Sequence, residues 1–421
     1  MHAFETHTKA AILGVVMAAT CYTSAVDATI IYNAAGTSNI NTSVYDNVLV
    51  DHASAIVNVN SRGIVRGVND PSLGMFNTAV RTRRGNRKVT GPGRILAAAG
   101  QSAINMAGNG SVVRLSSRAS VIGDVVNEFT TPGWRAESTA ITRLYIEDNA
   151  RVTGNVRYAG FMRMEDNARV LGSIINPSNG SMSLDMRGGL VTGQLQMGGL
   201  NDYVFDMSGG SILGGFRGAS GYVDMTMTGG TISNGFQTGT AITGGIYGGS
   251  INGGVDLTNG GSAASHLIID GGEFNTDPGD YLFSMSHTPF GSPSSASLDI
   301  YGGEFGYVEQ GLGFFLDQFV DFSVYGWDLA LTGGVLSGYL LDGSWFSNPF
   351  TFGAGWSGTF NIYNVMAPMA MTASLDTLSA FTTLESHSVP EPGTMGMLAA
   401  CVLGMMMFGR RRFEGASIFR M

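Results

Sequence analysis

A unit of about 20 residues recurs along the middle of this chain and constrains its fold more than any other feature. Each unit has an apolar residue directly before a turn, as at Met186 before the glycine pair 188–189 and at Met207 before the pair 209–210. Six intervals between these apolar positions are 18 to 22 residues long and three are 31. A fixed period with occasional longer intervals predicts one structural unit that accepts loop insertions. The positions are Leu115, Ile146, Met164, Met186, Met207, Met227, Tyr247, Ile269, Ile300 and Leu331.

Apolar residues inside the unit have the spacing of β-strands. Leu184 and Met186 lie two positions apart, as do Leu298 and Ile300, which places both side chains of each pair on one face of a strand. The Gly-Gly or Asp-Asn that follows tolerates positive φ, so the chain can turn sharply there. Two or three short strands per unit make one coil of a parallel β-helix, whose inward residues stack into a continuous core. We therefore predict an all-β fold, a single-stranded parallel β-helix (solenoid). Its register is least defined at Tyr247, because residues 242–254 are rich in glycine.

Composition favours β-structure with many turns. Glycine accounts for 62 of 421 residues, charged residues for 13% and hydrophobic residues for 44%, a balance unlike that of a disordered chain. Both cysteines, Cys21 and Cys401, lie in segments that we expect to serve export. Disulfide bonds are therefore not expected to stabilise the mature domain, which must rely on buried apolar area and hydrogen-bonded strands.

Charge divides the chain into two unlike halves. Residues 29–217 contain 17 Arg and one Lys against 13 acidic residues, whereas residues 218–409 contain 16 acidic residues and no basic one. The chain is therefore an electrical dipole. The acidic half argues against a nucleic acid as the main partner.

A segment of three parts lies near the C-terminus. An extended tetrapeptide comes first, an apolar run at 395–408 follows, and a basic cluster closes the segment. Proline fixes φ and lacks a backbone donor, so the tetrapeptide stays non-helical and open to a processing enzyme. Residues 393–409 would span about 26 Å as a helix, slightly less than a bilayer core of about 30 Å, and the basic cluster favours a cytoplasmic C-terminus. The tetrapeptide is Val389, Pro390, Glu391 and Pro392, and the basic cluster is Arg410, Arg411 and Arg412.

This segment resembles the PEP-CTERM sorting domain of Gram-negative bacteria. The resemblance implies that an exosortase-type enzyme of the inner membrane processes the tripeptide 390–392 and releases the protein toward the cell surface, the outer membrane or the extracellular matrix. A permanent C-terminal membrane anchor is the alternative. The repeats resemble the β-helices of autotransporter passengers and of pectin-lyase-like proteins, which implies the fold alone.

The N-terminus has the features of a signal peptide. An apolar stretch at 10–20 follows Lys9, and Val26 and Ala28 fit the small-x-small cleavage pattern. Cleavage after Ala25 is a second choice, and a lipoprotein modified at Cys21 is a third. A signal peptide implies export through the Sec machinery.

These features divide the chain into seven parts. The expected parts are a signal peptide (1–28), an N-terminal cap with the first coils (29–110), β-helix repeats (111–310), the last coils with an aromatic cap (311–366), a linker (367–388), the sorting signal (389–412) and a short tail (413–421).

Catalytic signals are weak, and no cofactor is expected. His52, His266 and His287 are isolated in the expected mature region, so we interpret them as structural. Asp185, Asp206 and Asp224 recur at coil spacing, and such a row of carboxylates is more often a solvated face than a site. We predict a surface or matrix protein that is structural or adhesin-like and not an enzyme. A polysaccharide lyase or hydrolase is the alternative, because β-helices include many such enzymes.

Two charged stretches are candidate binding sites. One is acidic and would hold calcium through hard oxygen ligands, although a solvated loop is the simpler interpretation. The other is basic and would bind an anionic extracellular polysaccharide or the phosphate of lipopolysaccharide, although an exposed flexible loop is the simpler interpretation. The acidic stretch comprises Asp270, Glu273, Asp277 and Asp280, and the basic stretch comprises Arg81, Arg83, Arg84, Arg87 and Lys88.

Overall fold

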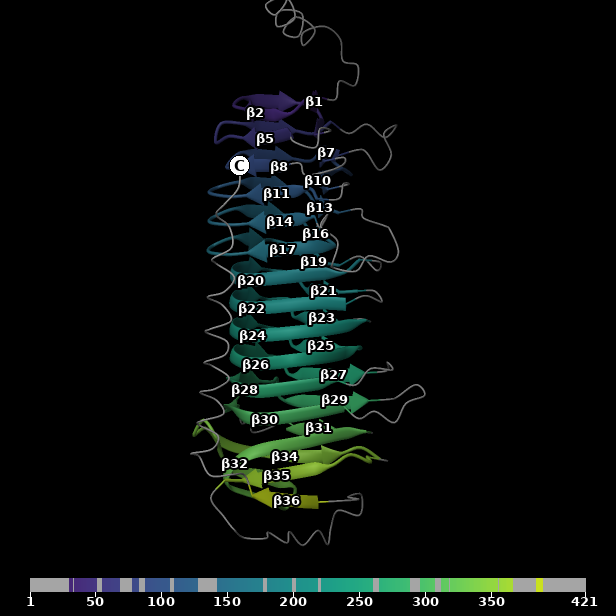
Figure 1. The fold of residues 1–421 in the computed structure, drawn as a ribbon, viewed down its shortest axis with the longest axis vertical. Helices are drawn as coiled ribbons and strands as arrows, with labels where there is room; N and C mark the ends of the chain where they lie inside the picture. The colour runs from purple at the N-terminus through teal and green to yellow at the C-terminus, as the bar shows by residue number, and fades with distance from the viewer. Residues whose placement is uncertain are drawn as a thin grey trace, which may run out of the picture.

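The computed structural model describes sixteen segments of the chain. They are residues 30–32, 34–50, 55–68, 78–82, 88–106, 110–127, 142–176, 180–198, 202–218, 221–259, 265–287, 296–306, 312–317, 319–354, 356–365 and 384–388. These residues form 36 strands and no helix, and most strand pairs are parallel. The strands lie across the long axis of the molecule and stack along it, from β1 at one end to β36 at the other (Figure 1). This arrangement is consistent with the predicted β-helix-like solenoid. The expected signal helix and C-terminal helix lie outside the described residues.

Each coil presents three faces, which we number in chain order. In the first six coils, the strands of the first face are β2 (Gly36–Ile40), β5 (Ala55–Val59), β8 (Lys88–Gly91), β11 (Val112–Leu115), β14 (Arg143–Ile146) and β17 (Gly160–Met164). Those of the second face are β3 (Ser43–Tyr45), β6 (Ile64–Arg66), β9 (Arg94–Leu96), β12 (Ser120–Ile122), β15 (Arg151–Thr153) and β18 (Arg169–Val170).

The third face runs the length of the solenoid as separate short strands. They are β1 (Ile30–Tyr32), β4 (Val48–Val50), β7 (Thr78–Thr82), β10 (Ser102–Met106), β13 (Val125–Val126), β16 (Val156–Arg157), β19 (Ile174–Ile175), β21 (Leu195–Met197), β23 (Phe216–Gly218), β25 (Phe236–Thr238), β27 (Val255–Asn259), β29 (Phe283–His287), β31 (Phe314–Leu316) and β34 (Trp345–Phe352).

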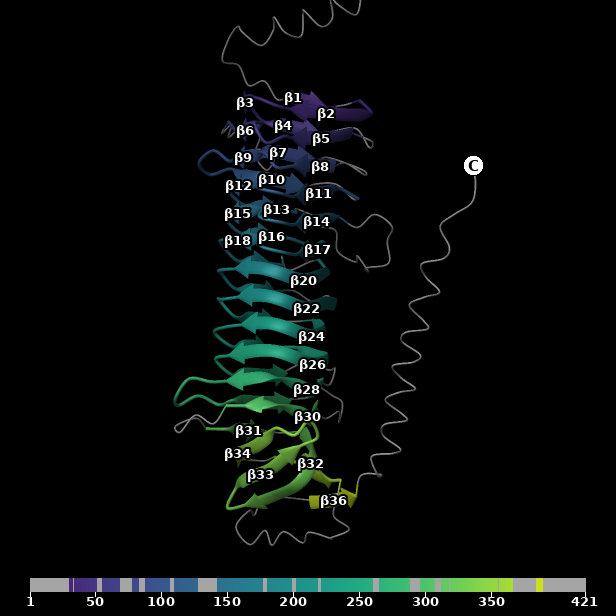
Figure 2. The ribbon, with the colours of Figure 1, turned by 90° about the vertical axis from the view of Figure 1, so that its left-hand side faces the viewer.

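From residue 182 onward the first two faces are joined into single bent strands, which Figure 2 shows as a stack of long arrows. They are β20 (Met182–Val191), β22 (Asp202–Ile212), β24 (Tyr222–Ile232), β26 (Ala241–Asn252), β28 (His266–Asn275) and β30 (Ala296–Phe305). The strand β32 (Val320–Thr332) continues the first face only, through residues 320–324. The remaining strands are β33 (Val335–Leu340), β35 (Phe360–Asn364) and β36 (Leu384–Ser388).

The glycine pairs make the bend possible for two different reasons. Gly210 has a φ of +85°, which glycine adopts without strain. Gly209 lacks positive φ, but a Cβ atom there would lie 2.6 Å from the carbonyl oxygen of Arg187 in the preceding coil. In the earlier coils Asp148 and Asp166 take φ of +58° at the same corner. The prediction of a sharp corner after each apolar position is therefore confirmed there.

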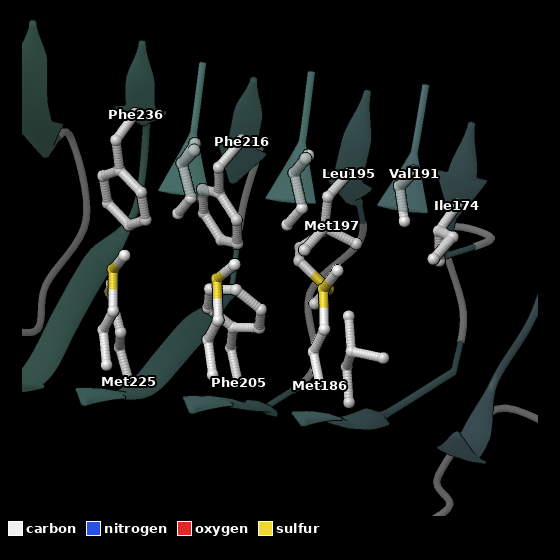
Figure 3. Packing of buried hydrophobic residues seen from close by; sticks show 14 of the residues in the cluster. Ile174, Met186, Val191, Leu195, Met197, Phe205, Phe216, Met225 and Phe236 are labelled. Carbon is white, nitrogen blue, oxygen red and sulfur yellow. The ribbon is translucent and has the colours of Figure 1, made fainter. Parts of the chain in front are cut away.

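The core is one continuous apolar column along the axis. Ile174, Leu195, Phe216 and Phe236 are register neighbours on the third face and point toward the first face (Figure 3). The rings of Phe216 and Phe236 stack with centroids 4.3 Å apart. On the first face, the predicted positions from Leu115 to Met227 pair one with the next, and all are buried.

Two of the ten predicted repeat positions are wrong. Met227 pairs with Ile246, and the neighbouring Tyr247 points outward with 47% of its surface exposed. Ile300 pairs with Val324 and not with Leu331. At the second position the chain reverses direction. Gly333 and Gly334, with φ of +59° and +80°, form a two-residue hairpin turn. β32 accordingly pairs antiparallel with β33, which pairs antiparallel with β34.

The C-terminal part continues the stack of strands. Phe314 and Phe350 stack with centroids 4.7 Å apart, so the aromatic segment continues the core into the last coils. Residues 384–388, the last five of the expected linker, form β36, which pairs in parallel with β35.

Candidate functional site

The predicted carboxylate row lies on the outer surface of the first face. Asp185 and Asp206 are register neighbours in consecutive coils. Asp224 pairs instead with Val204, two positions back along the strand, so it lies in the adjacent outward column. The three carboxylates therefore do not form one straight row. A spacing of about one coil along the sequence does not determine which outward column a residue occupies.

Asp185 is held by arginines on two sides. Nε of Arg163 in the preceding coil donates a hydrogen bond to Oδ2 of Asp185 at 2.8 Å, and Nη2 of Arg187 lies 3.0 Å from the same oxygen. The surroundings of Asp206 differ: burial raises its pKa, the Asp185 carboxylate raises it further, and a hydrogen bond with Thr226 lowers it. Asp185 is therefore paired with two arginines, whereas the pKa of Asp206 lies above that of an ordinary aspartate.

The predicted acidic stretch does not converge on one point. Asp270 is an exposed residue of β28, Glu273 is exposed on the second face, and Asp277 and Asp280 lie in an exposed turn. Within the described segments, no group of three or more His, Cys, Asp or Glu side chains is arranged to hold a metal ion. Burial, and then the carboxylate of Asp342, raise the pKa of Asp270.

The predicted basic stretch is spread over two faces. Arg81 is outward on β7 of the third face, and Lys88 begins β8 of the first face. Arg83, Arg84 and Arg87 lie outside the described residues, as do the cleavage residues Val26 and Ala28. The anion-binding hypothesis for these side chains stays a prediction.

One of the three histidines is not isolated. Nε2 of His266 lies 3.0 Å from Oδ2 of Asp299, 33 residues further along the chain. His266 pairs in register with Ser297, so the partner is a diagonal neighbour in the next coil. Only the correct coil register could have revealed this contact. His52 lies outside the described residues, and of His287 only the backbone is described.

The sequence did not predict a row of aromatic side chains on the antiparallel strands β32, β33 and β34. Tyr339 of β33 pairs with Trp327 of β32 on one side and with Trp345 of β34 on the other. The Trp327 and Tyr339 rings lie with centroids 6.3 Å apart, and those of Tyr339 and Trp345 4.9 Å apart. Trp345 is 55% exposed and Tyr339 41%. The type of hairpin turn at 333–334 was the signal that would have placed these three residues on one face.

A comparison with protein families finds a PEP-CTERM protein-sorting motif at residues 388–412. The motif contains all seven predicted sorting residues, from Val389 to Arg412, which lie outside the described residues. It implies sorting through the exosortase system and processing by an exosortase, a membrane enzyme. It also suggests an exported protein with a membrane-anchored intermediate. Comparisons with curated proteins and with solved structures find no match.

The match begins at Ser388, the last residue of β36. The sorting motif therefore starts at the residue where the last described strand ends. In the part of the chain that the structure describes, no helix is long and apolar enough to cross a membrane.

Proposed function

We propose that this protein is an exported structural rod of the cell surface or extracellular matrix, placed there after processing by an exosortase-type enzyme. The observation that supports the proposal best is the direct succession of β36 and the sorting motif. Processing within 390–392 leaves the new C-terminus next to the last strand of the solenoid. A rigid domain is thereby attached at one end, with its faces turned to the surroundings.

The test is a set of substitutions in the processing tripeptide. Replacing Pro390, Glu391 and Pro392 by alanine leaves the apolar run intact, so hydrophobicity cannot account for a difference. In a host that contains an exosortase, we expect the wild-type surface protein to lack the residues that follow the processing site and the variant to remain as a longer, membrane-bound form. Intact-mass measurement distinguishes them. Finding Arg410 to Arg412 on the surface-located wild type would favour a permanent anchor.

The exposed aromatic row favours an adhesive role with a neutral glycan as ligand. Flat exposed rings such as Tyr339 and Trp345 provide apolar surface against which the CH groups of a sugar ring pack. The absence of basic residues from 218 to 409 disfavours anionic polymers at this end. Binding of neutral polysaccharide that is lost in Trp345→Ala, but kept when Leu312, another exposed apolar residue, becomes Ala, tests the role.

A polysaccharide lyase or hydrolase is the second candidate. The observation that favours it is the pair of register neighbours Asp185 and Asp206, in which Asp206 has a raised pKa. We propose the non-catalytic role because the two arginines occupy Asp185. Incubation with neutral and acidic polysaccharides decides: new reducing or unsaturated ends that disappear in Asp206→Asn would establish the enzyme.

A further inference from the structure

An outward column of the second face carries opposite charges at its two ends. We call this column the second-face ladder. Its basic end has Arg151 and Arg169, which are register neighbours. Its acidic end has Glu273 and Glu304, which are also register neighbours. All four side chains are exposed.

The middle of the ladder is uncharged. Following the register from Arg169, the successive residues are Leu190, Ser211, Thr231 and Ser250, and the next is Glu273. At about 4.8 Å per strand, the seven steps from Arg151 to Glu304 span roughly 34 Å. Three of the four middle side chains are small, so a second surface can approach the backbone closely there.

Like charges stand next to each other at both ends of the ladder. Arg151 faces Arg169 across one strand spacing, and Glu273 faces Glu304 in the same way. Like charges in directly opposed positions destabilise a sheet. An opposing surface with the complementary charges would remove this cost.

Several charges of the first face are paired within the molecule, whereas those of the ladder form no ion pair among the described residues. Asp185 pairs with Arg163 and Arg187, while His266 pairs with Asp299. Among the ion pairs of the described residues, none includes the four charged residues of the ladder. Within the described part of the chain, the one side-chain hydrogen bond to these four residues is donated by Nδ2 of Asn275 to Oε1 of Glu273 at 2.8 Å.

The ladder is complementary to its own antiparallel copy. The midpoint between Arg169 and Glu273 coincides with the midpoint between Arg151 and Glu304, and both fall between Ser211 and Thr231. A twofold axis at that point sets Arg169 opposite Glu273 of the copy and Arg151 opposite Glu304 of the copy. A parallel copy would instead set each arginine beside its own equivalent. Arg94, two strands beyond Arg151, extends the basic end outside the paired length.

We propose that this protein forms an antiparallel dimer in which the second-face ladders of two copies meet. The strip is narrow, so the dimer is weak and salt-sensitive and not obligate. Its four symmetry-related ion pairs form a closed, isologous contact. The ladder does not include the sorting signal, so a test of dimerisation and a test of the proposed function give independent results.

Sedimentation velocity of the full chain in a mild non-ionic detergent tests the proposal. We expect dimers at about 20 mM salt that dissociate at about 500 mM, where screening is strong. Glu273→Lys/Glu304→Lys makes the ladder wholly basic, and Arg151→Glu/Arg169→Glu makes it wholly acidic. Each variant should lose at least about tenfold in dimer affinity, and an equimolar mixture of the two should recover it.

The matched control is Asp202→Lys/Asp224→Lys, which makes the same charge change with exposed residues of the first face. We expect this variant to dimerise as the wild type does. Recovery in the mixture shows that the variants are folded. A wild type that stays monomeric at low salt, or reversed variants that dimerise unchanged, would overturn the proposal.

Discussion

Arg163 of one coil and Asp185 of the next form an ion pair at 2.8 Å within the basic half of the solenoid. The side chain of Asp185 is 16% exposed and also contacts Arg187 of the same strand, so one carboxylate binds arginines from two consecutive coils. Replacing Asp185 by asparagine removes the negative charge and leaves Arg163 and Arg187 without their carboxylate partner.

We expect Asp185→Asn to reduce the free energy of unfolding by about 1 kcal/mol, since partly exposed pairs contribute modestly. Thermal unfolding followed by circular dichroism measures the change. Asp224→Asn is the control, because Asp224 lies on the same face and is exposed. Equal losses in both variants would show that the Arg163 contact contributes nothing.

Met207 is 1% exposed and lies in the stacked core between Met186 and Met227. Met207→Asp should cost several kcal/mol, because it buries a charge without a partner. The adjacent Ser208 points outward, so Ser208→Asp should leave the unfolding temperature nearly unchanged. The wild type should give a β-rich far-ultraviolet spectrum. An indifferent Met207→Asp would be incompatible with the solenoid.

Gly210 and Gly100 separate two effects of a side chain at positive φ. Gly100 has a φ of +75° and open space around it, so Gly100→Ala should cost about 1 kcal/mol from the backbone alone. At Gly210 the added Cβ would lie 2.6 Å from the carbonyl oxygen of Gly188. Gly210→Ala should therefore cost about 1–3 kcal/mol more. Urea titrations of both variants test the difference, and equal costs would contradict the tight corner.

Asp206 should make stability depend on pH. Burial and the neighbouring Asp185 raise its pKa in the folded protein, so the folded state binds the proton more tightly than the unfolded chain. The stability contributed by this group is full below the unfolded pKa and is lost as the pH rises through the folded pKa. Asp206→Asn should therefore be more stable than the wild type at neutral pH and equally stable in acid. Thermal unfolding midpoints of wild type and variant, measured from acid to neutral pH, test this prediction. Asp202→Asn, an exposed residue of the same strand, is the control.

The period of the repeat predicted the fold, but not the register everywhere. At Gly244 an apolar inward residue is missing, because a Cβ there would lie 1.9 Å from the carbonyl oxygen of Met225. The alternation of inward apolar residues at every second position is therefore lost in that strand. The sequence alone then does not show whether Ile246 or Tyr247 points inward. The glycine pair at 333–334 misled for a different reason: its sequence matches that of the coil corners, but the strands on its two sides pair antiparallel.

The candidate sites depend on register more than on composition. Residues that are neighbours across coils lie 18 to 38 positions apart along the chain, and the interval changes from coil to coil. The contact of His266 with Asp299, the separation of Asp224 from Asp206 and the order of charges in the second-face ladder all follow from these intervals. The sorting motif needed no register, because it is a continuous segment, and the family comparison finds it.

Stacking the strands across the long axis also determines how the molecule would respond to force. The hydrogen bonds between coils run along that axis (Figure 1), so a pull on the two ends loads the bonds of one coil boundary at a time. The solenoid would give way by peeling from an end, and each coil of about 20 residues would release roughly 70 Å of chain. A cell tethered through such a protein would meet a long, stepwise extension that dissipates work before the attachment breaks.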